Sequence, residues 1–119
     1  MKKVLLVGNC NFDGHMIKDY LESNFNVEVV LIDTIENAKK SLENKLDLIM
    51  VNRIGELDNK NGLELIDYVK EQKIKTPIML ITNYEDSMNE AIKHGGVMGF
   101  GKDNLNSKKT GLTLKKYLK

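Results

Sequence analysis

The side chains that could do chemistry in this 119-residue chain follow its short apolar runs. Asn52 follows one such run, and Thr82 and Lys102 follow the two later ones. A lysine and a threonine can hold the oxygens of an anion, whereas Asn52 offers only a neutral amide. Gly8 and Asn9, after the first run, add no carboxylate. The residue types therefore indicate anion binding or no chemistry.

Five apolar runs that we expect to be strands position these residues. They are continuous rather than alternating, which is typical of strands covered on both faces. The segments between them carry helical spacing, with Thr34 as a helix N-cap and Gly95 as a helix stop. The predicted strands are Val4–Val7, Val27–Ile32, Leu46–Val51, Pro77–Ile81 and a weaker Gly96–Phe100.

The alternation of strands and helices predicts an α/β fold over residues 1–119 as a single domain. Right-handed crossovers lead to a doubly wound five-stranded parallel sheet, flavodoxin-like, with strand order 2-1-3-4-5. Ligands of such sheets gather at the carboxyl ends of the strands, where the winding reverses. We call this edge of the sheet, at the carboxyl ends of the strands, the rim. The residues that we expect there are Gly8, Asn9, Cys10, Asn52, Arg53, Thr82, Asn83 and Lys102.

Four segments, in order, resemble the receiver domain of two-component response regulators. Asp47–Asn52, together with the later Asn61–Ile66, resembles the region around the third strand, and Pro77–Thr82 resembles the fourth strand with its switch threonine. Ala91–Gly95, followed by Lys102, resembles the fourth helix and the conserved lysine. The resemblance extends over nearly the whole chain and implies the same flavodoxin-like fold.

The resemblance also assigns positions. In the family, two acidic residues hold Mg²⁺, and these positions fall on Gly8 and Asn9 here. The phosphoryl-accepting aspartate falls on Asn52, while the threonine and lysine are retained as Thr82 and Lys102. The aromatic of the fifth strand corresponds to Phe100, although Gly101 alone separates it from Lys102 where the family usually has two residues.

Against that family pattern, the neutral amide of Asn52 is not a nucleophile toward phosphorus, and Gly8 and Asn9 provide no carboxylate for Mg²⁺. These departures predict a degenerate receiver, or pseudo-receiver, with no phosphorylation at the third strand, no enzymatic activity, no metal and no cofactor. We expect Lys102 to lie near Asn52 and to lack an ion pair there. Other acids could substitute for those lost: Asp58 and Glu56 lie in the long loop after Asn52 and could fold over the rim. We expect Asp13 instead to be an N-cap or first-turn acid of the first helix.

A competing motif lies near the end of the chain. Gly96–Lys102 matches the first seven positions of a phosphate-binding P-loop, but Asp103 replaces the Ser or Thr that binds Mg²⁺. The glycines also follow a predicted helix instead of a strand. A glycine-rich turn with a short strand is the better interpretation.

The composition of the chain argues against several classes of binding partner. The formal net charge is +1, and this near-neutral balance gives no electrostatic case for nucleic-acid binding, where a clustered basic stripe is expected. The single cysteine, Cys10, excludes an internal disulfide and fits a reducing cytoplasm. No apolar run approaches the length of a membrane span, so we expect no membrane partner.

Two functions remain. The first is a protein–protein interaction module of a two-component signalling protein or phosphorelay, which presents its fourth helix, fifth strand and fifth helix to a protein partner or to another copy of itself. The second is a sensor of an anion or small ligand in the crevice at the strand ends, with Lys102, Arg53 and Thr82 around it.

Overall fold

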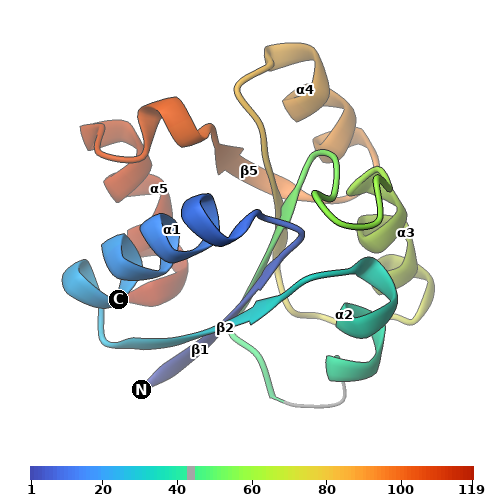
Figure 1. Ribbon diagram of the computed structural model, residues 1–119, viewed down its shortest axis with the longest axis horizontal. Helices are drawn as coiled ribbons and strands as arrows, with labels where there is room; N and C mark the ends of the chain where they lie inside the picture. The colour runs from blue at the N-terminus through green and yellow to red at the C-terminus, as the bar shows by residue number, and fades with distance from the viewer. Residues whose placement is uncertain (43–44) are drawn as a thin grey trace.

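A computed structural model describes residues 1–42 and 45–119 of the chain. Five parallel strands form one sheet in the order β2-β1-β3-β4-β5, so the predicted topology is confirmed (Figure 1). The strands are β1 (Lys2–Val7), β2 (Val27–Ile32), β3 (Leu48–Asn52), β4 (Ile78–Ile81) and β5 (Val97–Phe100). Each expected strand is present, with its ends moved by at most one or two residues.

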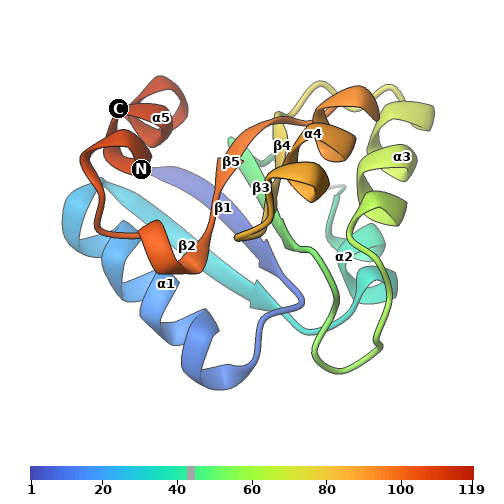
Figure 2. The same ribbon diagram turned by 90° about the horizontal axis from the view of Figure 1, so that it is seen from above.

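The helices between the strands cover both faces of the sheet. They are α1 (Asn11–Asn24), α2 (Ile35–Ser41), α3 (Leu63–Glu71), α4 (Glu85–Lys93) and α5 (Lys108–Leu118), and a short 3₁₀ helix, η1 (Lys102–Asn104), precedes α5. Figure 2 shows α1 and α5 on one side of the strands and α2, α3 and α4 on the other. Among the described residues, no helix combines the length and apolarity that crossing a bilayer requires.

Two hydrophobic clusters hold these layers together, one on each face of the sheet. Ile17 and Leu21 of α1 pack with Leu114 of α5 on the first face. Leu65 and Ile66 of α3 lie in the second. Because successive strand residues alternate between the faces, the fully buried run Leu48–Asn52 supplies both clusters, as a continuous apolar strand requires.

Local signals in the sequence determine several element ends. Thr34 caps α2, its Oγ1 accepting a hydrogen bond from the N–H of Asn37 at 3.1 Å. Gly95 follows α4 with a φ of 105°, a left-handed conformation that glycine adopts without strain. Both predictions are confirmed. Ser107 caps α5 in the same way through the N–H of Thr110, which explains why this helix forms despite Gly111.

Candidate functional site

The site lies where the carboxyl ends of β1 and β3 meet, and Asn52 is at its centre. Asn52 is the last residue of β3 and is only 8% exposed. Its side-chain amide donates to two backbone carbonyls, that of Ile54 at 2.8 Å and that of Gly8 at 3.3 Å. Asn52 therefore serves as a double hydrogen-bond donor that ties β3 and the loop after it to the end of β1.

Gly8 directly follows β1 and has a backbone conformation that disfavours any side chain. Its φ is 83°, in the left-handed region that other residues adopt only at a cost. A Cβ atom there would lie 3.3 Å from the Cα of Gly55 in the loop after β3. The carbonyl of Gly8 also accepts a hydrogen bond from the N–H of Glu56 at 2.9 Å. The loop thus occupies the space next to the position where the family has a carboxylate.

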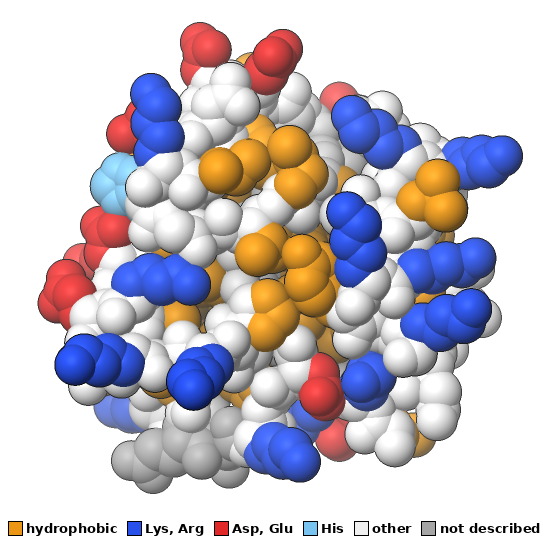
Figure 3. Space-filling model, turned by 180° about the vertical axis from the view of Figure 1, so that it is seen from behind, with side chains coloured by type: hydrophobic (Ala, Val, Ile, Leu, Met, Phe, Trp, Pro, Cys, Tyr) orange, Lys and Arg blue, Asp and Glu red, His pale blue; other side chains and the backbone are white. Residues whose placement is uncertain are grey.

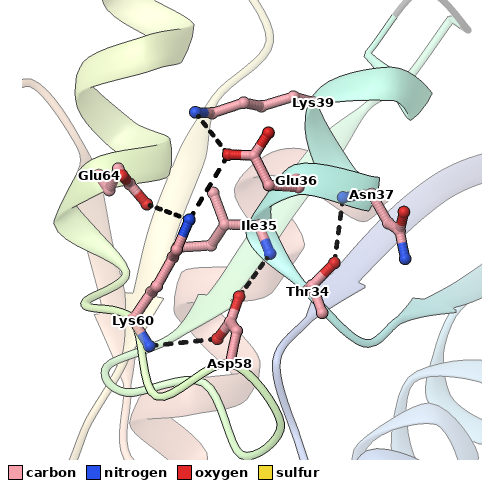
Figure 4. Close-up of polar contacts among 8 residues, drawn as sticks. All are labelled: Thr34, Ile35, Glu36, Asn37, Lys39, Asp58, Lys60 and Glu64. Carbon is pink, nitrogen blue, oxygen red and sulfur yellow. Dashed lines mark hydrogen bonds and ion pairs between the residues drawn. The ribbon is translucent and has the colours of Figure 1, made fainter.

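The loop of residues 53–62 is folded back on itself and anchored to α2. Ile54 and Asn61 form an antiparallel bridge, and the N–H of Gly55 donates to the carbonyl of Lys60 at 2.8 Å. The carboxylate of Asp58 accepts from the N–H of Ile35 at 3.0 Å and from the N–H of Lys60 at 3.2 Å. Figure 4 shows Asp58 reaching the first turn of α2 in this way.

Neither loop acid supplies the carboxylate that the rim lacks. Asp58 satisfies the free N–H of Ile35 at the start of α2, where a negative charge is also favoured by the helix dipole. Glu56 is exposed, and its backbone, not its side chain, contacts the end of β1. The alternative in which Asp58 or Glu56 folds over the rim finds no support in this arrangement.

Lys102 is not left unpaired, contrary to our expectation. Its ammonium group bonds the carboxylate of Asp13 at 2.7 Å, and both side chains are about three-quarters buried. Asp13 lies in the first turn of α1, as expected, and Cys10 is the N-cap, with its Sγ accepting from the N–H of Asp13 at 3.4 Å. The hydrogen bond from Lys102 holds the pKa of Asp13 below its ordinary value, although burial acts in the opposite direction.

Two other residues expected on the rim, Thr82 and Arg53, also have partners. The hydroxyl of Thr82 accepts from the N–H of Tyr84 at 3.1 Å, and the guanidinium of Arg53 lies 5.0 Å from the centre of the Tyr84 ring. Phe100 is buried in the cluster that contains Leu114. The register between β4 and β5 shifts by one residue before Phe100, so that Val97 pairs with Met79 and Phe100 with Ile81.

The residues present do not fit the Mg²⁺ ion that the resemblance implies. Mg²⁺ requires oxygen ligands, usually including one or two carboxylates. Gly8 has no side chain, and the Asn52 amide nitrogen faces two backbone carbonyls. Across residues 1–42 and 45–119, no three His, Cys, Asp or Glu side chains form a group that could hold a metal. The nearby acid, Asp13, is neutralised by Lys102.

The Asp13–Lys102 pair is expected to contribute about 0.5–1 kcal/mol to stability at neutral pH, the range of partly exposed pairs. Because the pKa of Asp13 is lowered in the folded state, this contribution is present above the unfolded pKa of about 4 and is lost as the pH falls through the folded value. A double-mutant cycle with Asp13→Asn and Lys102→Gln, measured by urea unfolding, checks this expectation. A coupling energy unchanged at pH 2 would contradict it.

The chain is similar to known proteins in its structure rather than in its sequence. No protein-family model matches the sequence, and no curated protein matches it. Among solved structures, the beryllofluoride-activated NtrC4 receiver domain dimer is 24% identical with a TM-score of 0.80, and the match covers 99% of this chain and 97% of that one. The chemotaxis protein CheY4 of Vibrio cholerae is 23% identical with a TM-score of 0.79, over 99% of both chains.

A two-component response regulator from Clostridium difficile is likewise similar. It is 23% identical with a TM-score of 0.79, and the match covers 98% of this chain and 95% of that one. The strand order, the helices on both faces and these three matches agree with the fold that the sequence predicted. The chain therefore has the fold of the receiver domains of response regulators.

Proposed function

We propose that this chain is a degenerate receiver domain, which works as a protein–protein interaction module and is not switched by phosphorylation at Asn52. The observation that carries the proposal is the pair of hydrogen bonds from the Asn52 amide to the carbonyls of Gly8 and Ile54. They put a hydrogen-bond donor where phosphoryl transfer needs a nucleophilic carboxylate. On this proposal the domain catalyses no reaction.

The retained lysine supports the same conclusion. In an active site for phosphoryl transfer, cations are directed at the transferring group. Here the ammonium of Lys102 is engaged by Asp13 at 2.7 Å, so an incoming anion would have to displace a carboxylate. The same contact makes the anion-sensing alternative the weaker of the two functions.

The surface of α4, β5 and α5 supports the choice of an interaction module. Large hydrophobic side chains are exposed on these elements: Met98 of β5 is 46% exposed and Leu112 of α5 is 55% exposed. Figure 3 shows hydrophobic side chains gathered across this side of the molecule, with lysines around them. A hollow of about 630 Å³ lies between the three elements, and side chains of a partner could fill it. Apolar surface of this kind, rimmed by charge, is typical of interfaces.

A second copy of the chain is the partner that the charges favour. Glu85 of α4 lines the hollow together with Lys109 of α5, and α5 carries three further lysines, Lys108, Lys115 and Lys116, and no acidic residue. In a two-fold symmetric pair each copy offers the same surface, so α4 of one copy can meet α5 of the other with opposite charge. The NtrC4 receiver domain is described as a dimer, which makes self-association a reasonable first test.

Leu112→Glu and Met98→Lys are each expected to weaken self-association at least tenfold, because a charge would have to be buried in the apolar centre of the interface. Leu57→Glu is the matched control, since Leu57 is 69% exposed but lies in the loop after β3. Sedimentation velocity over a concentration series measures the effect. A wild-type chain that stays monomeric throughout, or equal weakening by Leu57→Glu, would contradict self-association through this face.

A further inference from the structure

Six methionines are distributed over the chain, and they differ widely in exposure. Met50 of β3 and Met79 of β4 are fully buried in the core. Met1, Met16 and Met98 are exposed, at 84%, 36% and 46%. A peroxide oxidises a methionine only if it reaches the sulfur, so exposure separates the reactive side chains from the protected ones.

Two of the methionines line the hollow between α4, β5 and α5. Met98 of β5 is exposed there, whereas Met88 of α4 is only 9% exposed. The Met88 sulfur is also engaged, because its Sδ accepts a hydrogen bond from the N–H of Gly99 at 3.3 Å. Of the two, Met98 is therefore the more open to an oxidant.

The place of Met98 makes the polarity of its side chain important for binding. It belongs to the surface of α4, β5 and α5 that we proposed for self-association. A thioether is apolar, flexible and polarisable, which suits a contact that adapts to the surface of a partner. A sulfoxide in the same place carries a polar S=O group, which is costly to bury without a hydrogen bond. Oxidation of this one side chain should therefore oppose association.

We propose that Met98 is a redox-sensitive modification site that controls self-association, an inference that rests on the function proposed above. Hydrogen peroxide transfers one oxygen atom to the Sδ of Met98. The O–O bond of the peroxide breaks as the S=O bond forms, the sulfur is oxidised by two electrons, and water leaves. Methionine sulfoxide reductases reverse the step with two electrons from thiols and release the oxygen as water.

Pairing and oxidation exclude each other at this side chain. Met98 is open to solvent in the free chain, whereas a partner copy would cover it in a pair joined through α4, β5 and α5. Oxidation therefore acts on the free copy and keeps it free. Met16 is an internal reference, because it is exposed to a similar extent but lies on α1, outside the proposed interface.

The test treats the full chain with hydrogen peroxide at concentrations below and above the one at which it self-associates. Peptide mass spectrometry gives the oxidation rate of each methionine. We expect Met98 and Met16 to react at comparable rates in the dilute chain. In the concentrated chain the rate at Met98 should fall in proportion to the paired fraction, while the rate at Met16 should not change.

Sedimentation velocity then compares the reduced and the oxidised chain. Oxidation is expected to weaken self-association about tenfold, the cost of burying a polar group without its hydrogen bonds. The two stereospecific methionine sulfoxide reductases should together restore the original affinity.

Three variants assign the effect to one side chain. Met98→Leu keeps an apolar side chain without a sulfur, so it should self-associate like the wild type and lose the response to peroxide. Met98→Gln imitates the polar sulfoxide and should weaken self-association about as much as oxidation does. Met16→Leu is the matched control and should keep the full response.

The outcomes separate this inference from the function on which it rests. A reduced wild-type chain that does not self-associate would overturn both. A reduced chain that self-associates through α4, β5 and α5 but is unaffected by oxidation of Met98 would overturn the inference alone. So would a Met98→Leu variant that still dissociates in peroxide, because the response would then come from another methionine or from the thiol of Cys10.

Discussion

Replacing Asn52 by aspartate is expected to lower the free energy of unfolding by about 2–4 kcal/mol at neutral pH, rather than to restore a working acceptor. The amide donates to the carbonyls of Gly8 and Ile54, and a carboxylate in its place would face both oxygens with no proton to offer. The side chain is at a position only 8% exposed, so water cannot compensate. Urea unfolding of the wild type and the variant gives the difference directly.

The pH dependence of this effect has a definite sign. Burial and the two carbonyls disfavour the charged form, so the pKa of the introduced carboxyl should be higher in the folded state than in the unfolded one. The penalty should therefore be largest at neutral pH and shrink as the pH falls below the folded pKa, since the protonated acid can donate one of the lost bonds. Asn52→Ala is the control, because it removes both bonds without adding charge. An Asn52→Asp variant as stable as the wild type at pH 7 would show that these bonds do not hold the loop.

Gly8→Asp is expected to lower the free energy of unfolding by about 2–4 kcal/mol, and Gly8→Ala by at least about 1–2 kcal/mol. At a φ of 83° any side chain is strained, and its Cβ would press on the Cα of Gly55 at 3.3 Å. Gly111→Ala is the matched control. It lies inside α5, where a Cβ would make an ordinary contact with the Tyr20 hydroxyl at 3.8 Å, so alanine should stabilise the chain by about 0.5–1 kcal/mol.

Thermal or urea unfolding of the three glycine variants measures these differences. Equal tolerance at Gly8 and Gly111 would contradict the assigned backbone conformation.

The substitutions Gly8→Asp and Asn52→Asp are expected to act on the same loop. A carboxylate at Gly8 or at Asn52 disturbs the contacts that close the loop of residues 53–62 over β1. On the proposed function, we therefore expect the backbone around Gly8 and Asn52 to disfavour the carboxylates that phosphoryl transfer needs.

The fold was predictable because its signals are local. Continuous apolar runs identified five strands covered on both faces, and Thr34 and Gly95 marked helix ends through interactions with near neighbours. These signals depend on residues a few positions apart. They can therefore be recognised without knowledge of the tertiary contacts of the chain.

The contacts that define the site were not predictable in this way. Asp13 and Lys102 are 89 positions apart, and Asp58 meets Ile35 across 23 positions. No spacing in the sequence distinguishes these acids from others on the surface. Asn52 was predicted as a lost nucleophile, but its role as a double donor follows only from the orientation of the carbonyls of Gly8 and Ile54.

The bulge between β4 and β5 is a further case. It depends on pairing with β4, where Ile81 lies opposite Phe100 although Met79 lies opposite Val97. The sequence shows only that Gly101 alone separates Phe100 from Lys102, which says nothing of the shift. The position of the aromatic in the core follows from the strand pairing, which the sequence does not specify.

The most direct test of a receiver fold without phosphoryl chemistry is the intact mass of the chain after incubation with acetyl phosphate or a phosphoramidate and Mg²⁺. Phosphoryl transfer requires an in-line nucleophile and a metal to offset developing charge. Asn52 removes the first, and Gly8 with Asn9 removes ligands for the second. The account predicts no change in mass. A gain of one phosphoryl group, mapped to Asp13, Asp58 or another acid of the rim, would contradict it.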